Sequence, residues 1–221
     1  LAATPVENRL YLAGQPGYTD DGASYDRPAP ATAIHLLAAS GYKLSDGTLY
    51  DPAGLPVDLS LVVEAADPVA QQLAQEVTSS CAAIGVTVRV SQAGPPASDL
   101  LGAPTSQSLP AGWQMAIELR QVPAFASQVA DRYATGGSAN VDGYSSPAMN
   151  ALLDQIGSAS PAGLPAVYDE VDKQAWADYV DLPLVQVPVV VGLNSQLLNV
   201  EVGPYFADLA WDEQDWGFRA T

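Results

Sequence analysis

Residues 57–90 read VDLSLVVEAADPVAQQLAQEVTSSCAAIGVTVRV, and this stretch decides the fold class. At its start, apolar side chains stand at every second position from Val57 to Val63, which predicts a buried strand. At its end, Val86, Val88 and Val90 alternate in the same way and predict a second strand. The residues between the two strands decide how the strands are connected.

Those central residues predict an amphipathic helix. Asp67 can accept hydrogen bonds from the free amides of a helix start, and Pro68 suits the first helical position. Gly85 supplies the left-handed residue that commonly ends a helix. The apolar residues between share one helical face: Val69, Leu73, Val77, Cys81 and Ile84. A strand, a helix and a second strand in this order predict parallel strands joined by a crossover, which defines an α/β fold.

The rest of the chain repeats this alternation of helices and strands. A strand is predicted from Met115 to Leu119, and an extended run over residues 182–193 is confined to a sheet edge or divided by its prolines. Residues 91–112, rich in Ser, Gly, Pro and Ala, are interpreted as a loop. Periodicity predicts further helices over residues 28–40, 123–133, 147–156 and 164–179. We therefore expect a mixed sheet flanked by helices.

The charge balance excludes an affinity for polyanions. The 221 residues carry 25 Asp and Glu against 8 Lys and Arg, a formal net charge of −17, and the basic residues are scattered singly along the chain. Nucleic acids and anionic membranes are bound by clustered basic side chains, so neither is an expected partner. Cys81 is the only cysteine, which excludes an intramolecular disulfide.

No motif predicts catalysis, a metal site or a cofactor. The chain has no Gly-x-Ser-x-Gly sequence, and its single histidine, His35, stands beside an apolar helix face. The acidic turns lack the ligand spacing of a calcium loop, and Gly136-Gly137 lacks the Lys-Ser or Lys-Thr of a phosphate-binding loop. We therefore expect no cofactor, no metal site and no catalytic activity.

Four short motifs in a fixed order carry a family resemblance. They are Asn8 with Gly14-Gln15-Pro16-Gly17-Tyr18, then Leu36-Leu37-Ala38-Ala39-Ser40-Gly41-Tyr42, then Ala82-Ala83-Ile84-Gly85-Val86-Thr87-Val88, and Asn140-Val141-Asp142-Gly143-Tyr144-Ser145-Ser146-Pro147 before Leu152-Leu153. Over essentially its whole length the chain resembles the family 5 extracellular solute-binding proteins, the oligopeptide- and dipeptide-binding components of ABC importers.

The resemblance implies an architecture and a role. Residues 1–194 would form the second, C-terminal lobe of a type II periplasmic-binding-protein fold, and residues 195–221 a returning tail that packs on the first lobe. The full-length protein would be monomeric, would lie outside the cytoplasm, lipid-anchored to the outer face of the cell membrane, and would deliver peptides or another small solute to ABC permease subunits. Actinobacterial lipoproteins of the LpqW type share this fold and imply an alternative, the regulation of cell-wall glycolipid synthesis through protein partners.

Five residues are predicted to contact the ligand. Glu118 and Arg120 follow a strand expected at the centre of the sheet, and the carboxyl ends of strands are where open α/β sheets present ligand groups; a surface ion pair is the alternative. Asn140, Asp142 and Tyr144 belong to the fourth motif, which in the family lies near the cleft between the lobes. The alternative for these three is a turn-forming Asn and a Tyr that fills the lobe.

Overall fold

The structure is a computed structural model that describes residues 4–23, 28–65, 67–93, 112–123, 125–187, 192–200 and 210–219. The chain divides into two compact units, each with a hydrophobic core of its own. Unit 1 comprises Leu1–Ser24 and Val122–Thr221, and unit 2 comprises Tyr25–Gln121.

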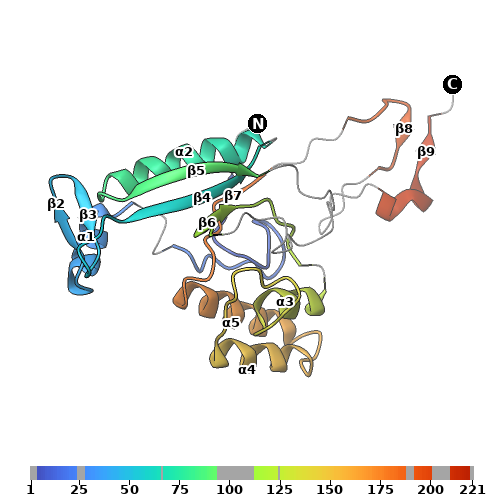
Figure 1. Ribbon diagram of the computed structural model, residues 1–221. Helices are drawn as coiled ribbons and strands as arrows, with labels where there is room; N and C mark the ends of the chain where they lie inside the picture. Colours follow the sequence, from blue (N-terminus) through green and yellow to red (C-terminus); the bar gives the residue numbers. More distant parts are fainter. Residues whose placement is uncertain are drawn as a thin grey trace. The chain divides into compact units, whose positions relative to one another are not determined.

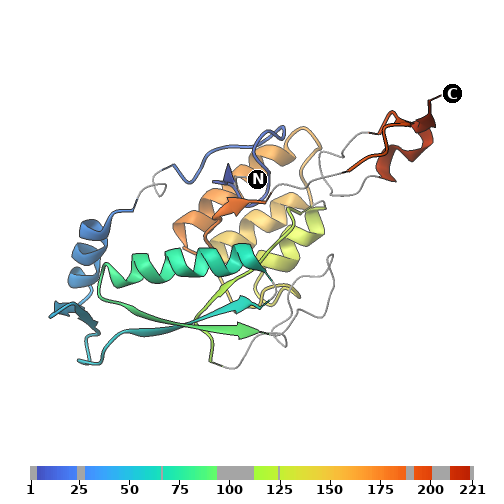
Figure 2. The same cartoon turned by 90° about the horizontal axis from the view of Figure 1, so that it is seen from above.

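Unit 2 is built on a parallel sheet of three strands with a helix against it (Figures 1 and 2). The central strand β4 (Asp58–Glu64) pairs with β5 (Thr87–Ala93) on one side and with β6 (Met115–Ile117) on the other. The strand, helix and strand predicted from residues 57–90 are confirmed. The strand before Glu118 was expected at the centre of the sheet, but within the described residues β6 is an edge strand.

Helix α2 (Pro68–Ala82) begins and ends where its sequence signals place it. The carboxylate of Asp67 accepts hydrogen bonds from the amides of Val69 at 2.8 Å and Ala70 at 3.2 Å. At the other end Gly85 has a φ of +81°, and a Cβ there would lie 2.8 Å from the backbone nitrogen of Leu49, so only glycine fits. The helix buries Ala70 and Ala74 against Leu61 and Val63 of the central strand, which form the core of unit 2.

Unit 2 also contains a further helix and a hairpin, and the hairpin buries Leu49. Helix α1 (Pro30–Ala39) has no buried residue. Strands β2 (Lys43–Ser45) and β3 (Thr48–Tyr50) form an antiparallel hairpin. Its two turn residues, Asp46 at φ +49° and Gly47 at φ +76°, have the left-handed conformation that short hairpin turns favour.

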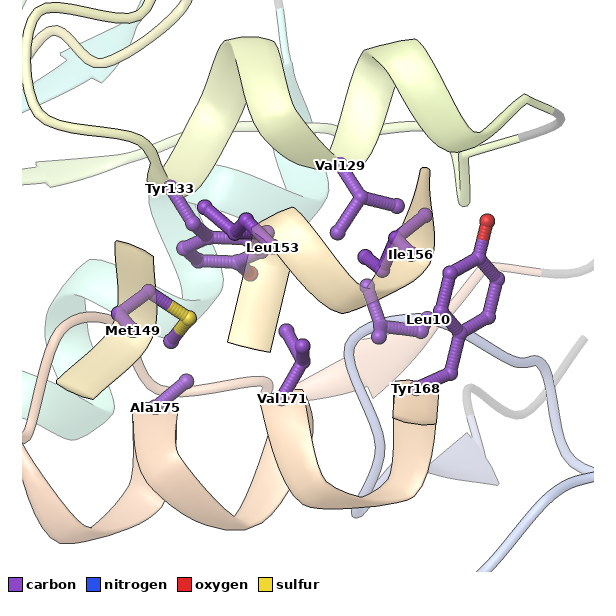
Figure 3. Packing of buried hydrophobic residues seen from close by; sticks show 9 residues of the cluster. All are labelled: Leu10, Val129, Tyr133, Met149, Leu153, Ile156, Tyr168, Val171 and Ala175. Atoms are coloured by element: carbon purple, nitrogen blue, oxygen red, sulfur yellow. The ribbon is translucent and has the colours of Figure 1, made fainter. Parts of the chain in front are cut away.

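Unit 1 packs three helices, α3 (Ala126–Tyr133), α4 (Pro147–Ile156) and α5 (Leu164–Ala177), around a second core. Figure 3 shows the side chains of the three helices converging with a residue of the N-terminal segment. The buried residues of this core are Leu10, Val129, Tyr133, Met149, Leu153, Ile156, Tyr168, Val171 and Ala175. The two-residue strands β1 (Thr4–Pro5) and β7 (Val185–Gln186) pair antiparallel.

Some elements differ in extent from the sequence-based expectation. Helix α3 begins at Ala126 and not at Pro123, because the side chain of Gln128 accepts the amide of Phe125 at 3.1 Å and so caps the helix there. Within residues 182–193 only β7 is a strand, and residues 188–191 lie outside the described part. The predicted returning tail, residues 195–221, contains a 3₁₀ helix (Ala210–Asp215) and the antiparallel pair β8 (Leu197–Leu198) and β9 (Gly217–Phe218). Most of the loop expected over residues 91–112 lies outside the described residues.

Candidate functional site

The carboxyl edge of the parallel sheet gathers acidic side chains. The register that pairs Val63 with Ile117 brings the next residues of β4 and β6, Glu64 and Glu118, to the same level of the sheet. Helix α2 also begins at this edge, with Asp67 at its cap. Open α/β sheets present ligand-binding groups at this edge because all parallel strands end there.

Glu118 and Arg120 bind each other. Nη2 and Nε of Arg120 lie 2.6 and 2.8 Å from the same carboxylate oxygen of Glu118, Oε2. The side chains retain 15% exposure for Glu118 and 24% for Arg120, so the pair is half-buried and the two charges neutralise each other. The other oxygen, Oε1, is buried and has no hydrogen-bond partner among the described residues. The expected alternative, an ion pair, is therefore what these two side chains form.

Asn140 holds together the loop that precedes α4. Its amide nitrogen donates to the carbonyls of Ala134 at 2.9 Å and Tyr144 at 2.7 Å, and its amide oxygen accepts the backbone N–H of Tyr144 at 2.9 Å. These three bonds use both the donor and the acceptor of the side chain. Asn140 therefore shapes the loop, as a turn-forming Asn does.

Tyr144 joins this loop to the end of α5. Its hydroxyl donates a 2.6 Å hydrogen bond to Asp178, and its ring packs against the core of unit 1. Burial, together with the bond to the Asp178 carboxylate, raises the pKa of Tyr144 to about 12. The hydrogen bond from Tyr144 lowers the pKa of Asp178, so this carboxyl is ionised at neutral pH.

Asp142 differs from its two neighbours in the motif. Its side chain is exposed, next to Gly143, whose φ of +70° turns the chain. The structure thus places Asn140, Asp142 and Tyr144 in one loop of unit 1. Glu118 and Arg120 form a separate group in unit 2.

A buried network of charges in unit 1 was not predicted from the sequence. The backbone N–H of Arg9 donates to Asp172 at 2.9 Å, and its guanidinium lies 3.3 Å from the same oxygen and 4.2 Å from the centre of the Trp176 ring. Asp181 binds both Arg9 and Arg132. Asp172 is fully buried, and this burial raises its pKa although Arg9 opposes the shift. The partners lie 163 residues apart in the sequence, so no local pattern could have indicated the network.

Among the described residues, no three His, Cys, Asp or Glu side chains lie together as a group able to hold a metal ion. None of the helices described combines the length and the apolar character that a membrane crossing needs. Unit 1 has an open groove of about 420 Å³ between α4 and α5, and unit 2 has one of about 520 Å³ beside α2.

The fold is that of the periplasmic solute-binding proteins. The periplasmic EDTA-binding protein EppA superposes on 99% of the chain with a TM-score of 0.81 at 23% identity, and the chain covers 41% of it. A periplasmic oligopeptide-binding protein of Thermotoga maritima, solved with mannohexaose, superposes on 83% of the chain with a TM-score of 0.63 at 19% identity, and 36% of that protein is covered. These likenesses confirm the predicted α/β class.

Sequence comparison leads to the same class of protein. The chain is similar to the oligopeptide-binding protein OppA of Mycobacterium tuberculosis, with 27% identity over 201 residues. The match covers 88% of this chain and 32% of OppA, so the chain spans about a third of that relative. No protein-family model matches the chain. The predicted resemblance to the oligopeptide-binding type of solute-binding protein is confirmed, and the relatives are named as binding proteins and not as enzymes.

Proposed function

We propose that the chain is the second lobe of an extracytoplasmic solute-binding protein, which captures peptides or another small solute for an ABC importer. The similarity to OppA, which extends over 88% of the chain, carries this proposal. The fold shared with EppA supports it independently of sequence. Capture would occur by closure of two lobes around the solute, as in other two-lobed binding proteins.

The five predicted residues are the proposed solute contacts of this lobe. At the sheet edge, Glu118 and Arg120 would offer a neutralised acid and base, which suits a polar solute more than a highly charged one. In unit 1 the exposed carboxylate of Asp142 would reach the solute directly. Asn140 and Tyr144 would contribute chiefly by fixing the loop that carries Asp142, since their polar groups already bond within unit 1.

The rest of the architecture follows the relatives. Residues 1–194 would form the lobe, and residues 195–221 would return to a first lobe. The exposed side chain of Phe218, at 76%, would be covered there. In this proposal the full-length protein is a monomer, anchored by a lipid to the outer face of the cell membrane, and its partners are permease subunits. The transport-protein names of the relatives favour this role over the regulation of cell-wall glycolipid synthesis by an LpqW-like lipoprotein.

A thermal-shift screen of the full-length protein tests the proposal. A solute that binds only the native state stabilises it by RT ln(1 + [L]/Kd), about 2.7 kcal/mol at a hundredfold excess over Kd. We expect one class in a panel of short peptides and oligosaccharides to raise the melting temperature, and Asp142→Asn to weaken that effect. Asp154→Asn, at an exposed acid of α4, is the matched control and should leave the shift unchanged. A panel without any shift would refute the role in solute capture.

A further inference from the structure

The turn that ends α5 places a tyrosine where glycine is the usual residue. The N–H of Tyr179 donates to the carbonyl of Trp176 at 3.3 Å, and the N–H of Val180 donates to that of Ala175 at 3.2 Å. These two bonds define the Schellman ending of a helix, in which the residue after the cap is left-handed. Tyr179 occupies that position with a φ of +53°, and 75% of its surface is exposed.

The choice of residue is unfavourable for the backbone. Among the described residues the two other non-glycine positions with positive φ are Asp46 and Asn199, and Asp and Asn tolerate this conformation. A bulky aromatic side chain does not. Strained residues of this kind are concentrated where a protein makes functional contacts.

The preceding residue is also unfavourable where it stands. Asp178 caps the carboxyl end of α5, where the helix dipole disfavours a negative charge. The Tyr144 hydroxyl that it accepts is neutral, and no basic side chain in the described chain forms an ion pair with Asp178. Two successive residues therefore contradict the local preferences of a helix end, which is typical of a site kept for function.

The charge of the surface points to a cation as the missing complement. Five of the eight basic side chains, namely Arg9, Arg89, Arg120, Arg132 and Lys173, are paired with acids of the same chain. With 25 acidic residues, the chain has a large excess of negative charge. A positively charged partner surface would be attracted by this excess and would neutralise Asp178 together with the helix end.

We infer that Asp178 and Tyr179 form a contact for a Lys or Arg side chain on a protein partner. The cationic group would pair with the Asp178 carboxylate and lie against the face of the Tyr179 ring, a combination of ion pair and cation–π contact. Neither residue lines the groove between α4 and α5, and both are exposed, which suits a protein surface and not an enclosed solute site. The inference rests on the proposed importer role, in which the partner is the permease.

Binding of the full-length protein to its own permease and ATPase subunits, reconstituted in nanodiscs, tests the inference. Tyr179→Asn keeps a residue that tolerates the left-handed turn but removes the ring, and we expect the affinity to fall about tenfold. Tyr179→Phe keeps the ring and should retain the wild-type affinity. Asn199→Gly, which relaxes the same conformation elsewhere in the chain, should also bind normally. The affinity of the wild type should fall as salt rises.

The solute-induced thermal shift, measured on the same variants, separates this inference from the proposed function. We expect Tyr179→Asn to keep the full shift. Loss of the shift in this variant would assign Tyr179 to the solute site and overturn the inference. The inference would also be overturned if Tyr179→Asn bound the nanodiscs as tightly as the wild type does. If the wild type binds the nanodiscs but gives no shift with any solute, the proposed solute capture fails and the partner contact stands. If the wild type does not bind the nanodiscs, the contact itself is refuted.

Discussion

Replacement of Arg9 by Met tests the buried charge network of unit 1. Arg9 and Asp172 have side-chain exposures of 1% and 0%, and the guanidinium also binds Asp181 and covers the Trp176 ring. Met fills a similar volume without the charge. The variant therefore leaves Asp172 in the interior without its compensating cation.

The expected cost is large compared with the stability of a domain. Removing one partner of a buried ion pair costs roughly 3–5 kcal/mol, because the remaining charge is not solvated. Domains of this size have free energies of unfolding of about 5–15 kcal/mol. Arg9→Met should thus remove a substantial part of the stability of unit 1, while Arg9→Met combined with Asp172→Leu, which removes both charges, should recover most of it.

The pH dependence of the variant has a definite sign. The pKa of Asp172 is raised in the folded state by burial, and Arg9 opposes the rise. For a carboxyl whose pKa is raised on folding, stability is fully present below the unfolded pKa and is lost as the pH rises through the folded pKa. Without Arg9 the folded pKa moves higher still, so the deficit of the variant should shrink as the pH is lowered from neutrality.

Urea unfolding, followed by tryptophan fluorescence at about pH 7.5 and about pH 5, measures both effects. The double variant controls for the change in shape, and Lys173→Met, which removes a cation exposed by 49%, controls for the loss of a surface charge. A cost below about 1 kcal/mol for Arg9→Met at neutral pH, in the range of an exposed pair, would refute the reasoning. So would a deficit that grows as the pH falls.

Substitutions at three further positions test other parts of the structure by the same unfolding assay. Tyr144→Phe should cost about 1 kcal/mol, because a half-exposed hydrogen bond to a carboxylate is lost. It should also flatten the alkaline side of the curve of unfolding free energy against pH. The pKa of Tyr144, raised from 10.0 to about 12, gives stability that is full below pH 10 and is lost as the pH rises through 12. Asp67→Ala should cost about 1 kcal/mol by uncapping α2, and Asp67→Asn, which can still cap, should cost less. Met149→Ala should cost about 2–5 kcal/mol by opening a cavity in the fully buried core of unit 1, and an unchanged midpoint would contradict that packing.

The sequence predicted the elements whose signals are local. Asp67 and Gly85 bound α2 because a cap and a left-handed glycine act within one turn of the chain. Pro147 likewise begins α4 as predicted. The start of α3 was missed because the Gln128 side chain, and not the proline at 123, sets it.

Within the candidate site, the sequence could predict only the contacts between residues that are close together in the chain. Asn140 and Tyr144 stand in one motif, and the structure joins them by hydrogen bonds within that loop. The pairing of Glu118 with Arg120 also follows from their closeness in sequence. Arg9 was missed because its partner Asp172 comes from the opposite end of the chain, and only tertiary packing brings them together.

Native mass spectrometry of the full-length protein tests solute capture most directly. The protein is incubated with a mass-labelled form of the peptide or oligosaccharide that gives the largest thermal shift. We predict a single adduct of one labelled solute per protein molecule. This labelled adduct should disappear when an unlabelled competitor of the same class is added in excess. A spectrum in which the protein stays unliganded throughout the panel, or takes up solutes in graded, unsaturable numbers, would contradict the account.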